Sequence, residues 1–246
     1  MRFKENIHRL IWGEEHWLVS ARTESPSVLE DGSGRLDELR PDFPLLMKRI
    51  LAKDRLSVQV HPNDETAPLT GGEAKSEMWC LLKDCSIYAG LREGVGPEDV
   101  RRAVADGSFE VLLVRHDGRA GDVFYIPGGM VHAICGDCDI LEIQQSSNTT
   151  YRLYDWGRTG ADGRPRKLHV DAALKTIDFS LPPPKPVRAL KTPYFDFEQF
   201  GPDAEPRVLT SKGYLFAYSA DAGAELFMPG ETCVLPAGRA WKTATF

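Results

Sequence analysis

Residues 121–132 read Gly121-Asp122-Val123-Phe124-Tyr125-Ile126-Pro127-Gly128-Gly129-Met130-Val131-His132, with Gly, Pro, Gly and His at fixed spacing. The apolar run before the proline is typical of a buried β-strand, and the two glycines after it favour a tight turn. The chain then returns as a second strand that begins with His132. This stretch therefore predicts a strand–turn–strand unit whose histidine points inward.

The spacing Gly-x5-Pro-x-Gly-x2-His resembles the second signature motif of the cupin superfamily. The asparagine that some cupins carry further on is replaced here by Gly136. The resemblance implies a jelly-roll β-barrel, which is a mainly-β fold.

The rest of the chain also favours short strands separated by turns, with few and short helices. We expect helices at 97–106 and 170–177 and a short turn at 36–39. Helix–strand alternation and a glycine-rich phosphate loop are both missing from the sequence, which argues against a Rossmann or P-loop fold. The expected strands lie at 56–60, 78–82, 87–91, 111–114, 122–126, 132–135, 140–144 and 150–154.

A proline-rich segment divides the chain. Residues 181–187 begin Leu181-Pro182-Pro183-Pro184-Lys185-Pro186, which is typical of a stiff, extended linker. We expect a catalytic cupin domain at 1–180 and a small C-terminal β lobe at 188–246, with strands at 214–218, 225–228 and 232–235. Because Pro236-Ala237-Gly238 is similar to the Pro-Gly-Gly turn at 127–129, the lobe is predicted to be a shortened, degenerate second cupin-like unit.

Composition limits the function. The chain has 246 residues, 42% of them apolar, and a net charge of −6, which argues against a general nucleic-acid binder. No apolar run approaches the roughly 18 residues of a membrane span, and the first residues lack the apolar stretch of a signal peptide. We therefore expect a cytoplasmic protein without a membrane or nucleic-acid partner.

The five cysteines are an odd number, which argues against a disulfide framework. Two of them form the segment Cys135-Gly136-Asp137-Cys138, which is a lone CxxC. Its Gly-Asp centre is typical of a hairpin turn.

Candidate metal ligands begin in the segment Leu56-Ser57-Val58-Gln59-Val60-His61. On a strand, Ser57, Gln59 and His61 point to the same face. Three polar side chains on the inner face of a β unit are costly unless a partner such as a metal ion satisfies them. A solvent-facing strand is an equally good interpretation of this segment alone.

Lys75 and Glu77 are also two residues apart, at the start of an expected strand. An exposed charged pair is the simpler interpretation of that segment alone. Combined with Gln59, His61 and His132, however, Glu77 completes a set of two imidazoles, one carboxylate and one amide. Such nitrogen and oxygen donors suit Zn²⁺ and also accept Fe²⁺, Mn²⁺ or Co²⁺. Open positions on the metal would make the site catalytic rather than structural.

Longer stretches make the resemblance specific. Over residues 10–179 the chain resembles the type I mannose-6-phosphate isomerases, especially the shorter bacterial branch that lacks a helical insertion. The matching stretches, in chain order, are LSVQVHPND, KSE, IPGGMVHAI, EIQQSSNTTYRLYDW and RKLHVDAAL.

This resemblance implies a set of site residues and one Zn²⁺ per chain. It places metal ligands at Gln59, His61, Glu77 and His132, catalytic groups at Lys75, Glu142 and Arg152, and substrate or phosphate contacts at Lys48, Ser57 and Arg158.

The implied reaction interconverts mannose 6-phosphate and fructose 6-phosphate through a cis-enediolate. Either Lys75 or Glu142 would transfer the proton, and Arg152 would stabilise the developing oxyanion. A structural ion pair between Arg152 and Asp155 is the alternative for that arginine. The implied partner is a small sugar phosphate, and the protein is expected to be a monomer or a homodimer. Alternatives for the whole chain are a non-catalytic sugar-phosphate-binding cupin and another metal-dependent cupin enzyme, such as a dioxygenase.

Overall fold

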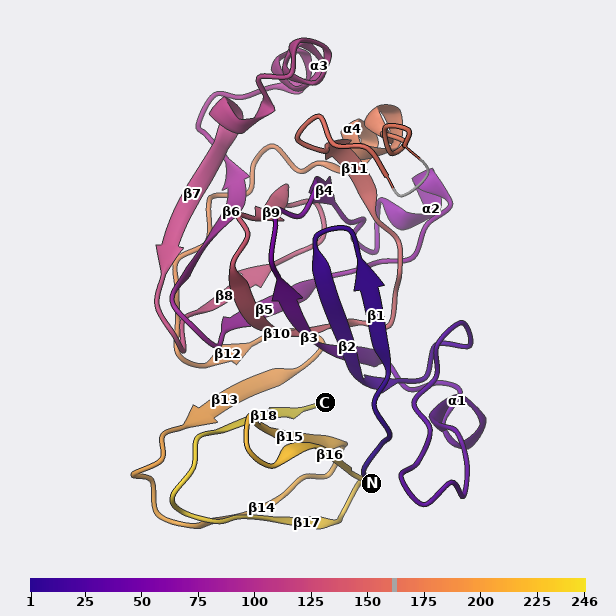
Figure 1. Ribbon diagram of the computed structural model, residues 1–246, viewed down its shortest axis with the longest axis vertical. Helices are drawn as coiled ribbons and strands as arrows, with labels where there is room; N and C mark the ends of the chain where they lie inside the picture. Colours follow the sequence, from indigo (N-terminus) through magenta and orange to yellow (C-terminus); the bar gives the residue numbers. More distant parts are fainter. Residues whose placement is uncertain (161–162) are drawn as a thin grey trace.

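The computed structural model describes residues 1–160 and 163–246, which form a mainly-β protein (Figure 1). The six-stranded sheet runs in the order β1 (Ile7–Leu10), β2 (Gly13–Ser20), β3 (Leu45–Ala52), β10 (Cys138–Gln145), β5 (Glu77–Leu81) and β8 (Val123–Ile126). A five-stranded sheet follows the order β11 (Tyr151–Tyr154), β4 (Val58–Val60), β9 (His132–Ile134), β6 (Cys85–Leu91) and β7 (Leu113–Gly118).

These two sheets pack face to face. One buried cluster joins Trp79, Phe124 and Ile140 of the six-stranded sheet to Ile87 and Ile134 of the five-stranded sheet. The mainly-β cupin fold is thereby confirmed. Among the described residues, hydrogen bonding leaves two separate sheets rather than one closed barrel.

Two of the helices in the described ranges cover the outer face of the five-stranded sheet. The helices are α1 (Leu36–Leu39), α2 (Ala67–Thr70), α3 (Pro97–Asp106) and α4 (Val170–Thr176), with a 3₁₀ turn at Phe109–Leu112. Val100 and Ala173, from α3 and α4, pack with Val58 and Leu153 of the sheet. None of the helices in the described ranges has the length and apolar character that a membrane crossing requires.

A third sheet lies against the outer face of the six-stranded sheet. Figure 1 shows it at the end of the molecule opposite α3. It runs in the order β12 (Leu190–Lys191), β13 (Asp196–Phe200), β18 (Trp241–Thr245), β15 (Leu215–Ser219) and β16 (Gly223–Phe227), beside a two-stranded sheet of β14 (Arg207–Thr210) and β17 (Thr232–Leu235). Phe197 and Phe216 pack here with Met47, Met78 and Ile143 in one buried cluster.

The proline-rich segment packs along the first two sheets. Val187 and Val123 exchange backbone hydrogen bonds of 3.0 Å in both directions. Pro183 lies close to Gly90: a methyl group on that glycine would lie only 2.9 Å from the Cα of Pro183. The division into a domain at 1–180 and a lobe at 188–246 remains a prediction.

Most of the expected elements are present where the sequence placed them. The helices expected at 97–106 and 170–177 are α3 and α4, and the turn at 36–39 is α1. The strand expected at 111–114 is wrong in its first half. A strand would place Val111 on the same face as Phe109 and Leu113, which are buried, yet Val111 is 63% exposed. The chain makes a 3₁₀ turn there instead, and β7 begins at Leu113.

The segment around Gly136 and Asp137 does turn, with positive φ at both residues. The expected hairpin is nevertheless wrong, because β9 and β10 belong to different sheets. This turn carries the chain from one sheet to the other.

The turn at 127–129 connects β8 of one sheet to β9 of the other and lies against the chain that follows β4. The backbone N–H of Gly129 donates to the carbonyl oxygen of His61 over 2.8 Å. Gly129 has a φ of 94°, which favours glycine. A methyl group on Gly128 would lie 2.6 Å from the carbonyl oxygen of Pro62. The two glycines therefore allow the turn to approach the backbone next to His61.

We expect Gly128→Ala to reduce the free energy of unfolding by about 1–3 kcal/mol, because the added methyl group must displace the backbone at Pro62 and Asn63. Urea unfolding followed by circular dichroism measures this change. Gly201→Ala is the matched control, since a methyl group there meets nothing within 4 Å. Equal stability of the two variants would contradict the role of this close approach.

Candidate active site

Three buried side chains from both sheets converge on one point. The nearest ligand atoms of His61, Glu77 and His132 all lie within 4.8 Å of one another. His61 directly follows β4, Glu77 begins β5 and His132 begins β9. All three residues are at most 1% exposed. The predicted inward orientation of His132 is confirmed.

Backbone carbonyls orient both imidazoles. The Nδ1 of His61 lies 2.8 Å from the carbonyl oxygen of Thr149, and the Nδ1 of His132 lies 2.9 Å from that of Met130. Because a carbonyl oxygen only accepts, each Nδ1 carries the proton and donates it. The Nε2 atoms are then free to bind a metal. Such hydrogen bonds are typical of the outer support of metal-binding histidines.

Burial also fixes the protonation of the imidazoles. It lowers the pKa of His61 well below its ordinary value, and it lowers the pKa of His132 to about 3. Both rings are therefore neutral at physiological pH, which is the form that binds metals.

A divalent cation fits this cluster. Oε1 of Glu77 and Nε2 of His132 are buried and have no hydrogen-bond partner within the described residues. Burial raises the pKa of Glu77, so its ionised form requires positive charge nearby. The ammonium of Lys75 already supplies some: its Nζ lies 2.9 Å from Nε2 of His61 and donates to Oε2 of Glu77. Glu77 and His132 would bind a metal ion through buried atoms that have no other partner in the described residues, and His61 through the Nε2 atom that Lys75 contacts here.

Gln59, the fourth expected ligand, lies beside this cluster. It is the register partner of His132 across β4 and β9, and of Arg152 across β4 and β11. It also lines the adjoining pocket. The sheet thus places its amide between the metal cluster and the arginine.

The pocket has a volume of about 370 Å³, within the range of small-molecule sites. It brings together six of the expected site residues from several strands. These are Lys48, Ser57, Gln59, Lys75, Glu142 and Arg152. The other residues that line it are His8, Leu10, Trp12, Glu15, Trp17, Ile50, Leu56, Asn148, Thr150 and Arg166.

Strand alternation explains why these groups meet. In β10, Leu141 and Ile143 face the C-terminal sheet, so Glu142 faces the other way, toward the pocket. In β5, Met78 and Cys80 likewise face the C-terminal sheet, while Glu77 faces inward. One face of the six-stranded sheet is therefore apolar and the other carries the chemistry.

Glu142 is held in a buried network of charges. Its Oε1 accepts from the indole N–H of Trp79 over 2.9 Å, and its Oε2 lies 3.3 Å from Nζ of Lys48. Burial alone would raise the pKa of Glu142, but Lys48 and Lys75 lower it, to about 2. Glu142 is therefore ionised at neutral pH.

Lys48 lies between two carboxylates. Its Nζ is 3.3 Å from both Glu15 and Glu142. Burial would lower the pKa of Lys48, but these carboxylates raise it overall. With both neighbours negative, Lys48 is arranged to hold Glu142, and its charge is already compensated before any phosphate binds.

Arg152 lines the pocket without forming an ion pair in the described part of the chain. Its Nη1 donates to the carbonyl oxygen of Lys167 over 3.0 Å, and its buried Nε has no hydrogen-bond partner there. The alternative ion pair with Asp155 is not formed. Asp155 instead binds Arg158, with 2.7 Å between Oδ1 and Nη2, and Arg166, with 2.6 Å between Oδ2 and Nε.

Arg158, an expected phosphate contact, is not among the pocket-lining residues of the described chain. Its guanidinium binds Asp155, Asp54 and the carbonyl oxygen of Arg55. Arg166, which the sequence analysis did not single out, lines the pocket instead.

Two further pocket residues were also missed: Glu15 and Trp17, on β2. The indole N–H of Trp17 donates to Glu15 over 2.8 Å. Glu15 and Trp17 are two residues apart, with His16 between them, and this spacing is a signal that they share one face of a strand. It resembles that of Gln59 and His61, but no motif in the N-terminal segment assigns it to a site.

Comparison with known proteins gives consistent relatives, although no protein-family model matches the chain. A mannose-6-phosphate isomerase of Streptococcus mutans is 34% identical over 215 residues, which cover 73% of this chain and 68% of that protein. A probable mannose-6-phosphate isomerase of Bacillus subtilis is 38% identical over 183 residues, 66% of this chain. That match spans only 58% of the Bacillus protein.

The fold agrees with solved structures. The crystal structure of the mannose 6-phosphate isomerase from Bacillus subtilis superimposes with a TM-score of 0.84 over 100% of this chain and 99% of that one, at 21% identity. A mannose 6-phosphate isomerase bound with zinc and yttrium gives a TM-score of 0.67 at 12% identity, over 99% and 98% of the two chains. On the sequence relationships, and with this fold, the chain belongs to the mannose-6-phosphate isomerase family.

Proposed function

We propose that this protein interconverts mannose 6-phosphate and fructose 6-phosphate, as an aldose–ketose isomerase that requires Zn²⁺. The observation that carries the proposal is the buried cluster of His61, Glu77 and His132, next to a pocket lined by acidic and basic groups. Family membership supports the same reaction.

His61, Glu77 and His132 would hold the metal, with Gln59 as the fourth ligand. A divalent metal held there would supply Lewis-acid stabilisation of the negative charge that develops on the substrate during enolisation. Two neutral imidazoles and one carboxylate fit zinc, which needs no redox change in this role.

Glu142 is our candidate for the base that moves the proton between C1 and C2. It is ionised at neutral pH and lines the pocket. Trp79 and Lys48 fix its carboxylate, so that little reorganisation is needed on proton transfer. Lys75, beside the ligands, would donate hydrogen bonds to the substrate oxygens.

Arg152 would stabilise the oxyanion that develops during enolisation. Its guanidinium lines the pocket and forms no ion pair with a described carboxylate, so its charge is available to the substrate. A sugar-phosphate-binding protein without activity would have no use for an ionised Glu142 fixed beside the metal ligands. A dioxygenase would not need the arginine.

Expression in the cytoplasm and a monomeric or homodimeric state remain predictions, as does the absence of nucleic-acid and membrane partners. None of them is needed for the chemistry of the pocket.

We expect His132→Ala to lose most of its bound zinc and at least about 100-fold in kcat, because one of two imidazole ligands is removed. Arg152→Ala should keep its zinc and lose about 100- to 1,000-fold in kcat. Elemental analysis measures the metal, and a coupled assay with phosphoglucose isomerase measures turnover. His116→Ala is the control, since His116 is not among the described residues that line the pocket or form the cluster. Full activity of either test variant would exclude its assigned role.

Glu142→Gln should reduce kcat by about 100- to 10,000-fold while zinc content stays unchanged, because an amide of the same shape does not accept the proton. The same coupled assay measures this, and the exposed Glu98→Gln serves as the control. If Glu142→Gln kept wild-type kcat and Lys75→Met lost it, the base would be Lys75 and this assignment would be wrong.

A further inference from the structure

Three guanidinium groups, one from β11 and two from the segment that follows it, gather with few carboxylates to balance them. Arg158 and Arg166 share Asp155, and Arg158 also contacts Asp54. Arg152 has no carboxylate within 4 Å among the residues that the structure describes. Burial lowers the pKa of Arg152, and the positive charges of Arg166 and Arg158 lower it further, although Asp155 offsets part of this shift. The local excess of positive charge favours an anion.

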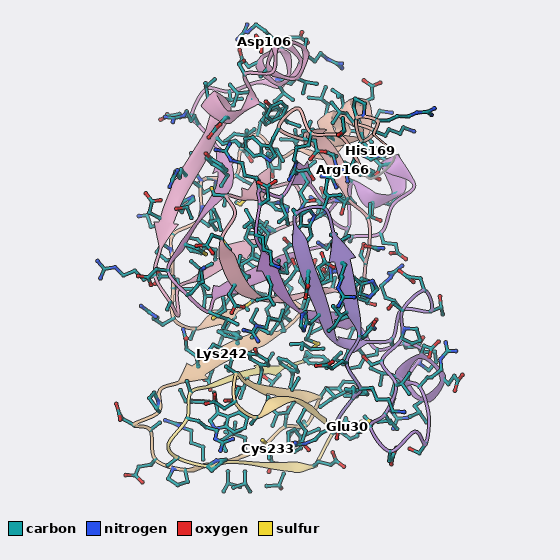
Figure 2. All side chains as sticks on the ribbon, viewed as in Figure 1. Glu30, Asp106, Arg166, His169, Cys233 and Lys242 are labelled. Carbon is teal, nitrogen blue, oxygen red and sulfur yellow. The ribbon has the colours of Figure 1, made fainter. Side chains whose placement is uncertain are left out.

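Only two of these arginines face the pocket. Arg152 and Arg166 line it together with Asn148 and Thr150, whereas Arg158 turns away onto Asp155, Asp54 and the carbonyl oxygen of Arg55. Figure 2 shows Arg166 beside His169, near α4 and β11 and away from the C-terminal lobe. The Nε of Arg152 is buried and has no hydrogen-bond partner in the described ranges.

Arg166 is already fixed in orientation. Its Nε and Nη2 bind the two oxygens of Asp155 side by side. This fork geometry uses two of the five N–H donors and holds the planar guanidinium in place. Within the described residues its side chain makes no other hydrogen bond, so its remaining donors are available to a ligand in the pocket. Fork-like donation of this kind suits phosphate oxygens.

We propose that Arg166 binds the phosphate group of the substrate, and that Arg158 does not. Asp155 is then a positioning residue that orients Arg166. This inference rests on the proposed function for the identity of the substrate, but the binding of a phosphate dianion at this place follows from the local charges alone.

The first test is kinetic. Arg166→Gln should raise the KM for mannose 6-phosphate by about 10- to 100-fold, as expected for the loss of charged hydrogen bonds, with a smaller effect on kcat. Arg166→Lys keeps the charge but loses the fork, so its KM should be intermediate. Arg115→Gln is the matched control, because Arg115 also binds a nearby aspartate, Asp117, but lies on β7 outside the pocket.

The second test needs no turnover. Inorganic phosphate should raise the melting temperature of the zinc-loaded wild type, since a ligand that binds the folded state stabilises it. Arg166→Gln should lose this shift. The melting temperatures of Arg166→Gln and Arg166→Lys are also compared with that of the wild type in the absence of phosphate. A variant that melts like the wild type is folded, so that a missing phosphate shift then reports a loss of binding.

The outcomes separate the two proposals. A phosphate shift that depends on Arg166, in a protein without isomerase activity, would support this inference and reject the proposed function. An active enzyme in which Arg166→Gln keeps both its KM and its phosphate shift would overturn the inference alone. The inference would also be overturned if Arg158→Gln lost the phosphate shift and Arg166→Gln retained it.

Discussion

The hydrogen bond from the N–H of Gly129 to the carbonyl oxygen of His61 connects the two sheets at the point where the site forms. His132 begins a strand of one sheet and His61 directly follows another strand of it, whereas Glu77 begins a strand of the other sheet. Two glycines let the connecting turn approach the backbone at Pro62 closely enough for this contact. Since the capacity of this cluster to bind a metal depends on the distances between its three side chains, the turn matters for the site although it contributes none of them.

Around that cluster, the charges are arranged in two groups that share one pocket. Lys48 lies between Glu15 and Glu142, and the ionised Glu142 lies near the metal ligands. Arg152 and Arg166 line the same pocket with fewer carboxylates around them. Such a separation suits a substrate with a neutral, reactive end and an anionic end. The net charge of −6 gives no indication of this, because it sums over the whole surface.

The sequence was informative where a contact is encoded by spacing along the chain. His132 follows from the glycine turn, and Gln59 and His61 from strand alternation, because period-two geometry is local. Glu15 could not be found in this way, since its pairing with Lys48 depends on how β2 lies beside β3. Tertiary pairing of this kind leaves no local pattern.

The arginines illustrate a second limit. Arg158 follows Arg152 by six residues, and the family resemblance implied a phosphate contact there. The structure has positive φ at Trp156 and Gly157, which reverses the chain just before Arg158 and directs it toward Asp155. A non-glycine residue with positive φ is uncommon, and its occurrence at Trp156 was not foreseeable from its type. Arg166 enters the pocket from the loop beyond this reversal.

The strands β3, β5 and β10 carry Lys48, Glu77 and Glu142 on one side and support the C-terminal sheet on the other. The contact between the C-terminal sheet and these strands is apolar, with Phe197 and Phe216 packed in one cluster with residues such as Met78 and Ile143. The rear sheet is therefore free to diverge in length and in loop sequence during evolution as long as this apolar contact persists. Any change that tilts these shared strands would be transmitted directly to Glu77 and Glu142, so that selection on a distant surface can adjust turnover.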